Sequence, residues 1–165
     1  MNANRSLEAI NLIEKQAMDR RIDMIIITEP NKRKIESGGW FKNKDGDVAV
    51  KVLNNDNIRI IVYRYEEESG YLALKTNIGT IIGCYLTPNE DITNYKNKLD
   101  SVAMENREMK NIILAGDFNA KSAYWNANKE DERGKILCEW MSERDLVVAN
   151  GGDGAMEMDQ KGRRG

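Results

Sequence analysis

The order of apolar and polar residues predicts a helix and then a strand at the start of the chain. Residues 6–20 carry apolar side chains at helical spacing, and Ser6 can cap the helix that this spacing predicts. Residues 23–28 are mostly apolar and β-branched, which is typical of a strand buried on both faces. A helix followed by such a strand favours helices packed on a sheet, and therefore an α/β fold.

The stretch that follows predicts a loop and then a run of short strands. Residues 31–47 are polar and contain glycines, so we expect a loop that Trp40 and Phe41 anchor. Short turns then separate four segments with strand character, and this pattern predicts an antiparallel meander. The four segments are residues 47–53, 58–65, 71–77 and 80–86.

The remaining pattern predicts a further helix, a buried strand, a helix and a last strand. Their expected ranges are residues 91–108, 111–116, 133–144 and 146–149. Residues 151–165 are rich in glycine and charge and have no apolar period, so we expect there a disordered tail or sequence unrelated to the fold. Residues 1–150 are then expected to form one domain.

The strongest candidate site lies where the strand over residues 111–116 ends. An apolar run reaches Gly116, and Asp117 and Asn119 follow two positions apart, so their side chains point the same way in an extended chain. Ligands bind at this end of strands in α/β sheets. The carboxylate can take a proton from water while the amide orients that water. An ordinary turn is an equally good interpretation, because Gly, Asp and Asn are common turn residues.

Composition restricts the chemistry that these residues can perform. The 165 residues include no histidine, which excludes a Ser-His-Asp triad, Cys-His catalysis and histidine-bound zinc. Carboxylates, amides and tyrosines remain, and this set suits a hard metal such as Mg²⁺. The net charge of −2 gives no basic excess, and no apolar run is long enough to predict a membrane span.

Three more polar residues stand at strand ends, the first of them at the end of a partial strand that the first residues of the chain could form. Asn2, Glu29 and Tyr85 each have an ordinary explanation, as a helix-entry residue, a solvated turn carboxylate and a packing tyrosine. Taken together with Asp117 and Asn119, they supply carboxylates, amides and a phenol. That set suits metal-assisted hydrolysis of a phosphodiester.

The segments around these residues resemble the endonuclease/exonuclease/phosphatase superfamily, which has the DNase-I-like fold. Within it, the chain is most similar to the endonuclease domain of insect non-LTR retrotransposons. The matching segments are residues 2–6, 28–30, 85–89 and 116–122, followed by Trp125 and residues 133–134.

The resemblance implies a four-layer α/β sandwich and a role for each candidate residue. Glu29, assisted by Asn2, would coordinate Mg²⁺, with Mn²⁺ as the alternative ion. Asp117 would orient or deprotonate the attacking water, Asn119 would hold the nucleophile, and Tyr85 would contact the scissile phosphate. The implied function is nicking of target DNA to prime reverse transcription. The implied location is nuclear and intracellular, with no membrane partner and a reverse transcriptase normally fused to this domain but absent from this chain.

The resemblance also implies later strands with a Ser-x-x-Asp segment and an Asp-His pair. The chain contains no histidine, so we expect the sandwich to be incomplete at its C-terminus. An active endonuclease, an inactive remnant of the same fold and a nucleic-acid-binding module therefore remain as alternatives. A binding module requires a basic surface, and one dense group of cations lies in residues 32–44, where a solvated loop explains it equally well.

Overall fold

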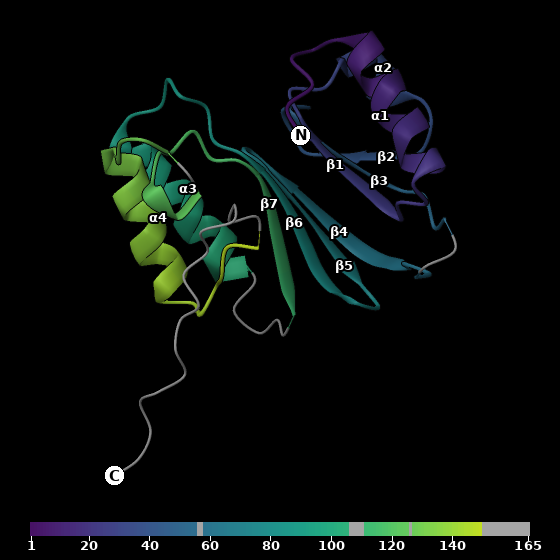
Figure 1. The fold of residues 1–165 in the computed structure, drawn as a ribbon. Helices are drawn as coiled ribbons and strands as arrows, with labels where there is room; N and C mark the ends of the chain where they lie inside the picture. The colour runs from purple at the N-terminus through teal and green to yellow at the C-terminus, as the bar shows by residue number, and fades with distance from the viewer. Residues whose placement is uncertain (56–57, 106–110, 126, 150–165) are drawn as a thin grey trace. The chain divides into compact units, whose positions relative to one another are not determined.

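The computed structural model describes residues 1–55, 58–105, 111–125 and 127–149 (Figure 1). The chain forms two compact units, Met1–Asn119 and Ala120–Gly165. The first unit contains both β-sheets and all five candidate residues.

The first sheet of this unit has three strands in the order β1-β3-β2. The central strand β3 (Val48–Val52) pairs antiparallel with β1 (Met24–Thr28) on one side and with β2 (Trp40–Lys42) on the other. Asn2 adds an isolated parallel bridge to Thr28. The start of the chain therefore lies against the carboxyl end of β1.

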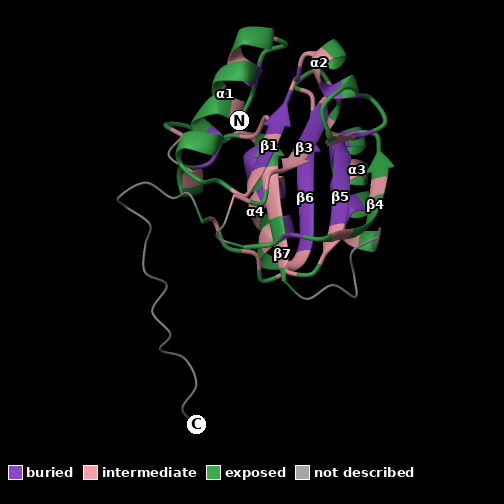
Figure 2. Cartoon of the chain, turned by 90° about the vertical axis from the view of Figure 1, so that its right-hand side faces the viewer, coloured by how far each residue is buried: buried purple, intermediate pink, exposed green. Residues whose placement is uncertain are grey.

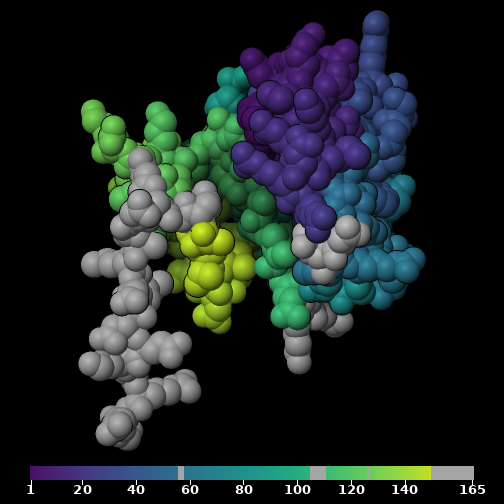
Figure 3. All heavy atoms as spheres, turned by 45° about the vertical axis from the view of Figure 1, so that its right-hand side comes forward, coloured from purple at the N-terminus to yellow at the C-terminus, as the bar shows by residue number. Residues whose placement is uncertain are grey.

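Two helices cover the outer face of this sheet. In α1 (Leu7–Asp19) the Ser6 hydroxyl caps the first turn by accepting a hydrogen bond from the Ala9 N–H at 3.1 Å, as the sequence predicts. The short helix α2 (Lys32–Glu36) follows β1. Buried apolar side chains from the two helices and from β1 and β3 form one cluster, which contains Ile10, Ala17, Ile25, Ile27, Ile35 and Ala49. Figure 3 shows the N-terminal residues, in purple, at the surface of the unit.

The second sheet has four strands in the order β4-β5-β6-β7. The strands β4 (Val62–Glu68), β5 (Tyr71–Thr76) and β6 (Gly79–Tyr85) form successive antiparallel pairs. The helix α3 (Ile92–Glu105) then precedes β7 (Ile112–Asp117), which pairs parallel with β6. Parallel neighbours need such a crossover, and it brings the two carboxyl ends to the same edge.

The two sheets pack face to face around a shared apolar core. Side chains of β3 meet those of β5 and β6 in one cluster, with Val48, Val50, Leu72, Leu74 and Ile81 fully buried. Figure 2 shows this burial along β3, β5 and β6. Gly83 of β6 allows the close approach, since a Cβ there would lie 2.7 Å from Cγ1 of Val48.

The second unit contains the short 3-10 helix η1 (Ala123–Trp125) and the helix α4 (Glu132–Ser142). The Asp131 carboxylate caps α4 and accepts hydrogen bonds from the backbone N–H groups of Gly134 and Lys121, at 2.7 and 3.0 Å. A Cβ on Gly134 would lie 1.9 Å from the Lys121 carbonyl oxygen, so this contact requires glycine. The Trp125 indole donates to the Ala120 carbonyl at 2.9 Å.

Several sequence predictions are wrong in detail. The segment expected as the first strand of a meander is β3, which pairs in the other sheet. The expected loop over residues 31–47 contains α2 and β2, because Asn31 caps a helical turn and Trp40 and Phe41 pair with β3. Residues 146–149 form no strand.

The strand β7 is half-exposed where a buried strand was expected. Ile113 is 48% exposed, because β7 is the last strand in the order of its sheet and has a neighbour on one side among the described residues. The predicted tail, residues 151–165, and the last part of the helix predicted over 91–108 lie outside the described residues. Within the described ranges, no helix is both long and apolar enough to cross a membrane.

The contact between Gly83 and Val48 generates the first prediction. Gly83→Ala should lower the free energy of unfolding by about 1–3 kcal/mol, because the added methyl group overpacks the space between the sheets. Val48→Ala removes the atom that the new methyl group meets. Urea denaturation of the double variant should therefore show a smaller loss than the sum of the two single losses. Additive losses would show that the sheets do not meet at this point.

Candidate active site

The five candidate residues gather at the carboxyl ends of strands from both sheets. Glu29 directly follows β1, and Asn2 forms its bridge to the last residue of that strand. Tyr85 and Asp117 are the last residues of β6 and β7 and lie opposite each other in the parallel register. Asn119 follows two residues later. Segments far apart in the sequence thus place these side chains at one edge of the first unit.

The amide of Asn2 connects the two carboxylates. Its Nδ2 donates to Glu29 Oε2 at 2.7 Å and to Asp117 Oδ2 at 3.3 Å. Its Oδ1 accepts from the backbone N–H of Asn4 at 2.8 Å, which fixes the orientation of the amide. The carboxylates of Glu29 and Asp117 therefore lie within reach of a single nitrogen atom.

Glu29 is held by hydrogen bonds at both its side chain and its backbone. Its Oε1 accepts from the Tyr85 hydroxyl at 2.8 Å, while its N–H donates to the Asp47 carbonyl and its carbonyl accepts from the Arg5 N–H. These contacts hold the residue at φ 46°, a left-handed conformation that is costly for a residue with a side chain. Hydrogen bonds from Asn2 and then Tyr85 lower the pKa of Glu29, so the carboxylate stays ionised at neutral pH.

The Tyr85 phenol keeps its proton across the physiological range. Burial, its hydrogen bond to Glu29 and the nearby negative charges raise the pKa of Tyr85 to about 12. The hydroxyl is therefore a hydrogen-bond donor at any pH at which the protein would work. It can donate either to Glu29, as here, or to a phosphate oxygen.

Asp117 and Asn119 are fixed by the backbone that follows β7. The Asn119 N–H donates to Asp117 Oδ1 at 3.1 Å, and Asn119 Nδ2 donates to the Leu86 carbonyl at 3.0 Å. Within the described residues, this leaves Asn119 Oδ1 as the amide atom that can accept from a water molecule. Gly116 is required here, since a Cβ would lie 1.9 Å from the Cys84 carbonyl oxygen.

Comparison with protein families and solved structures identifies the family of this chain. The model of the endonuclease-reverse transcriptase family matches residues 79–163, which are 85 of the 165 residues. The chain belongs to the endonuclease-reverse transcriptase family. The match includes Tyr85, Asp117 and Asn119.

The fold is similar to that of a solved retrotransposon endonuclease. The "endonuclease domain of TRAS1, a telomere-specific non-LTR retrotransposon" is 26% identical and gives a TM-score of 0.73 over 93% of this chain and 74% of that one. This similarity confirms the expected DNase-I-like α/β fold and supports an endonuclease domain of the non-LTR retrotransposon type. No curated protein matches the chain.

Asn43 and Asp47 also help to hold Glu29 in place, and the sequence analysis did not indicate them. Asn43 is 1% exposed, and its amide binds the Asp47 carboxylate at 2.7 Å and accepts from the N–H groups of Asp47 and Val48. The Asp47 carbonyl in turn accepts from the Glu29 N–H at 2.8 Å. Burial raises the pKa of Asp47. The only signal in the sequence was a polar turn before a strand.

The carboxylate oxygens of Glu29 and Asp117 are of the type that binds hard cations. Over the described residues, no group of three or more acidic, cysteine or histidine side chains could hold a metal ion. The site instead offers two carboxylates with amide and phenol oxygens. Mg²⁺ is commonly bound by one or two carboxylates together with substrate phosphates, so the residues fit this ion.

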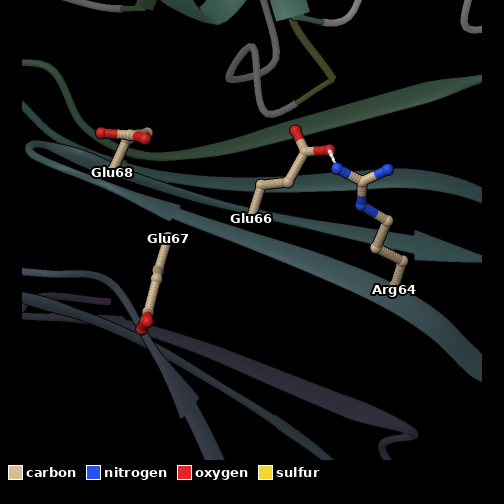
Figure 4. Close-up of a pocket in the computed structure, with 4 residues that line it drawn as sticks. All are labelled: Arg64, Glu66, Glu67 and Glu68. Carbon is tan, nitrogen blue, oxygen red and sulfur yellow. Dashed lines mark ion pairs between the residues drawn. The ribbon is translucent and has the colours of Figure 1, made fainter.

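A shallow hollow on β4 contains none of the candidate residues. Arg64, Glu66, Glu67 and Glu68 line it, and Figure 4 shows the ion pair between Arg64 and Glu66. Lys75 also pairs with Glu66, at 3.1 Å. Arg64, Glu66 and Glu68 point to one face of the strand and Glu67 points to the other, so they offer no set of atoms that converges on a ligand.

The hydrogen bond from Tyr85 to Glu29 generates the second prediction. Tyr85→Phe should raise the pKa of Glu29 toward the ordinary value of about 4.3, as NMR titration of the carboxyl carbon would measure. Because the folded pKa is lowered, this bond stabilises the fold above the ordinary pKa, and the stabilisation is lost as pH falls through the folded pKa. The difference in unfolding free energy between wild type and Tyr85→Phe should therefore shrink at acid pH.

The control for this prediction is Tyr63→Phe, at a phenol that is 69% exposed. It should leave the pKa of Glu29 unchanged. An unchanged pKa in Tyr85→Phe as well would show that the phenol does not bind Glu29 in solution.

Proposed function

We propose that this chain is a metal-dependent endonuclease that nicks one strand of DNA. The observation that carries the proposal is the Asn2 amide, which joins Glu29 and Asp117 while Tyr85 occupies the other oxygen of Glu29. Phosphodiester hydrolysis needs a base for water, a donor to the phosphate and a site for a cation. This arrangement supplies all three at one edge.

Asp117 is the proposed base. Both of its oxygens already accept one hydrogen bond, from Asn2 and from Asn119, so the carboxylate is fixed and retains lone pairs for a proton. The Oδ1 of Asn119, which has no partner among the described residues, would accept from the same water molecule and hold it in position. In this way the attacking oxygen is oriented before its proton leaves.

Glu29, with Asn2 beside it, is the proposed residue for Mg²⁺. The ion, when bound, supplies Lewis-acid stabilisation of charge on the phosphate. Glu29 is ready for this role because its lowered pKa keeps it ionised. Asn2 would act mainly by orienting Glu29, since its Nδ2 faces the carboxylates. Mn²⁺ is the alternative ion, because oxygen ligands suit both.

The Tyr85 phenol is the proposed donor to the scissile phosphate. The high pKa keeps its proton in place, so it contributes a hydrogen bond and not a negative charge beside the substrate. The hydrogen bond to Glu29 holds the phenol in position. A phosphate oxygen would compete with Glu29 for the hydrogen bond that the phenol donates.

The proposed biological setting follows from the family. The nicked strand would provide a primer end for reverse transcription by a reverse transcriptase fused to this domain in the parent element. Such a substrate would place the protein in the nucleus. The second candidate, an inactive remnant or a binding module of the same fold, is favoured by the lack of histidine in the sequence.

Plasmid nicking separates the two candidates and provides the third prediction. The purified chain in Mg²⁺ should convert supercoiled plasmid to the open circle, and a chelator should stop the reaction. Glu29→Gln and Asp117→Asn should each lower the single-turnover rate by at least about 100-fold, because each loses a group that acts directly on the reactants.

Matched controls are Glu67→Gln and Asp100→Asn, at exposed carboxylates on β4 and α3. Both should nick as wild type does. A folded wild-type chain that leaves the plasmid intact would contradict the proposal and favour the inactive remnant, as would nicking that survives both site substitutions.

A further inference from the structure

Some basic residues of the segment 32–44 form ion pairs and others do not, within the part of the chain that the structure describes. Lys34 forms an ion pair with Glu14 at 2.9 Å, and Lys42 lies 3.8 Å from Glu36. Lys32 has no carboxylate partner among the described residues. It belongs to the cationic segment 32–44, for which the sequence alone allowed a simple solvated loop.

Arg5 also has no ion pair among the described residues, and its backbone is tied to the site. Its N–H donates to the Glu29 carbonyl at 2.7 Å, and its carbonyl accepts from the Asn31 amide at 3.2 Å. Asn4 and Arg5 are both left-handed, at φ 45° and 58°. Two such residues in a row cost free energy, and the hydrogen bonds that fix them hold the backbone of Arg5, whose side chain is exposed, beside Glu29.

Lys32 directly follows Asn31, and its side chain is held by a hydrogen bond to the backbone of another segment. It begins α2 three residues after Glu29, and its Nζ donates to the Asp45 carbonyl at 2.9 Å. Its aliphatic stem lies along Gly46, where a Cβ would be 3.7 Å from the Lys32 Cε. The neighbouring residue Asp47 holds the Glu29 N–H. The ammonium is therefore held by a neutral carbonyl of the same turn that carries Asp47.

We infer that Arg5 and Lys32 form a basic rim beside Glu29 that binds phosphate groups of the DNA strand next to the scissile bond. This inference rests on the proposed function and assigns part of the binding energy to two named residues. Arginine binds phosphate through paired N–H groups and lysine binds it as a point charge. The charge of Arg5 reaches the site, where it adds to the hydrogen bonds from Asn2 and Tyr85 in lowering the pKa of Glu29.

The overall charge explains why a local rim matters. A chain with a net charge of −2 repels DNA at long range, so attraction has to come from local groups of cations at the surface. Each phosphate contact releases counterions and makes the affinity fall with salt, with a slope of about 0.9 per contact in a plot of log affinity against log salt concentration. The slope therefore counts the contacts and does not depend on catalysis.

The test measures DNA binding in a chain that cannot cut. Fluorescence anisotropy with a labelled DNA duplex, in the full chain carrying Asp117→Asn and with chelator present, gives affinities between roughly 50 and 200 mM salt. Adding Arg5→Gln or Lys32→Gln should weaken binding roughly tenfold each and lower the slope by about 0.9. Adding both should lower the slope by about twice that amount.

Arg20→Gln and Lys15→Gln are the matched controls. Both residues are exposed; Lys15 lies on α1 and Arg20 at its far end, since the 13 residues of that helix span about 20 Å. Their slopes should equal that of the parent. Thermal melting should show all variants folded, because Gln can replace Arg5 without losing either backbone hydrogen bond.

Two results would overturn the inference, and they are distinguishable. If the wild type nicks plasmid but Arg5→Gln and Lys32→Gln bind with the slope of the controls, the basic rim is wrong and the endonuclease proposal stands. If the wild type neither nicks nor binds the duplex, both proposals fail together.

Discussion

A single amide group connects the parts on which this site depends. Asn2 Nδ2 donates to Glu29, which follows a strand of the first sheet, and to Asp117, which ends a strand of the second. The carboxyl ends of two separate sheets are thus held at one point. The remaining contacts depend on this one: Tyr85 lies opposite Asp117 in the register of β6 and β7 and reaches Glu29 across the same gap. The core between the sheets, closely packed at Gly83, keeps these ends at hydrogen-bonding distance.

The sequence predicted the elements better than their partners. The helix capped by Ser6, the strands β1, β5, β6 and β7 and the helix α4 all follow from apolar period and turn residues, which are local signals. Pairing of strands is not local, and the sequence analysis therefore assigned the segment of β3 to the wrong sheet. The five candidate residues were predicted from their positions at strand ends and from a family resemblance. Asn43 and Asp47 were missed, because their importance lies in hydrogen bonds to Glu29 and to each other that no spacing reveals.

Residues that follow the Asp-x-Asn segment serve structure more than chemistry. Lys121, Trp125 and Gly134 stand in the segments that carry the resemblance, and in the second unit they hold the turn before α4 together through backbone contacts. Gly134 is fixed by the close approach of the Lys121 carbonyl, and Trp125 by its bond to Ala120. A motif can therefore contain residues that serve packing beside residues proposed to act in catalysis. Recognition of such a motif identifies the family without assigning a role to each of its residues.

The most direct test of the central claim is anomalous diffraction from crystals of the chain soaked in Mn²⁺, which has oxygen ligands in common with Mg²⁺ and a usable absorption signal. We predict one strong peak in contact with the Glu29 carboxylate, on the side of Asp117, and loss of that peak in Glu29→Gln. A peak bound elsewhere on the chain, or one that persists unchanged in Glu29→Gln, would contradict the assignment of this edge as the catalytic centre.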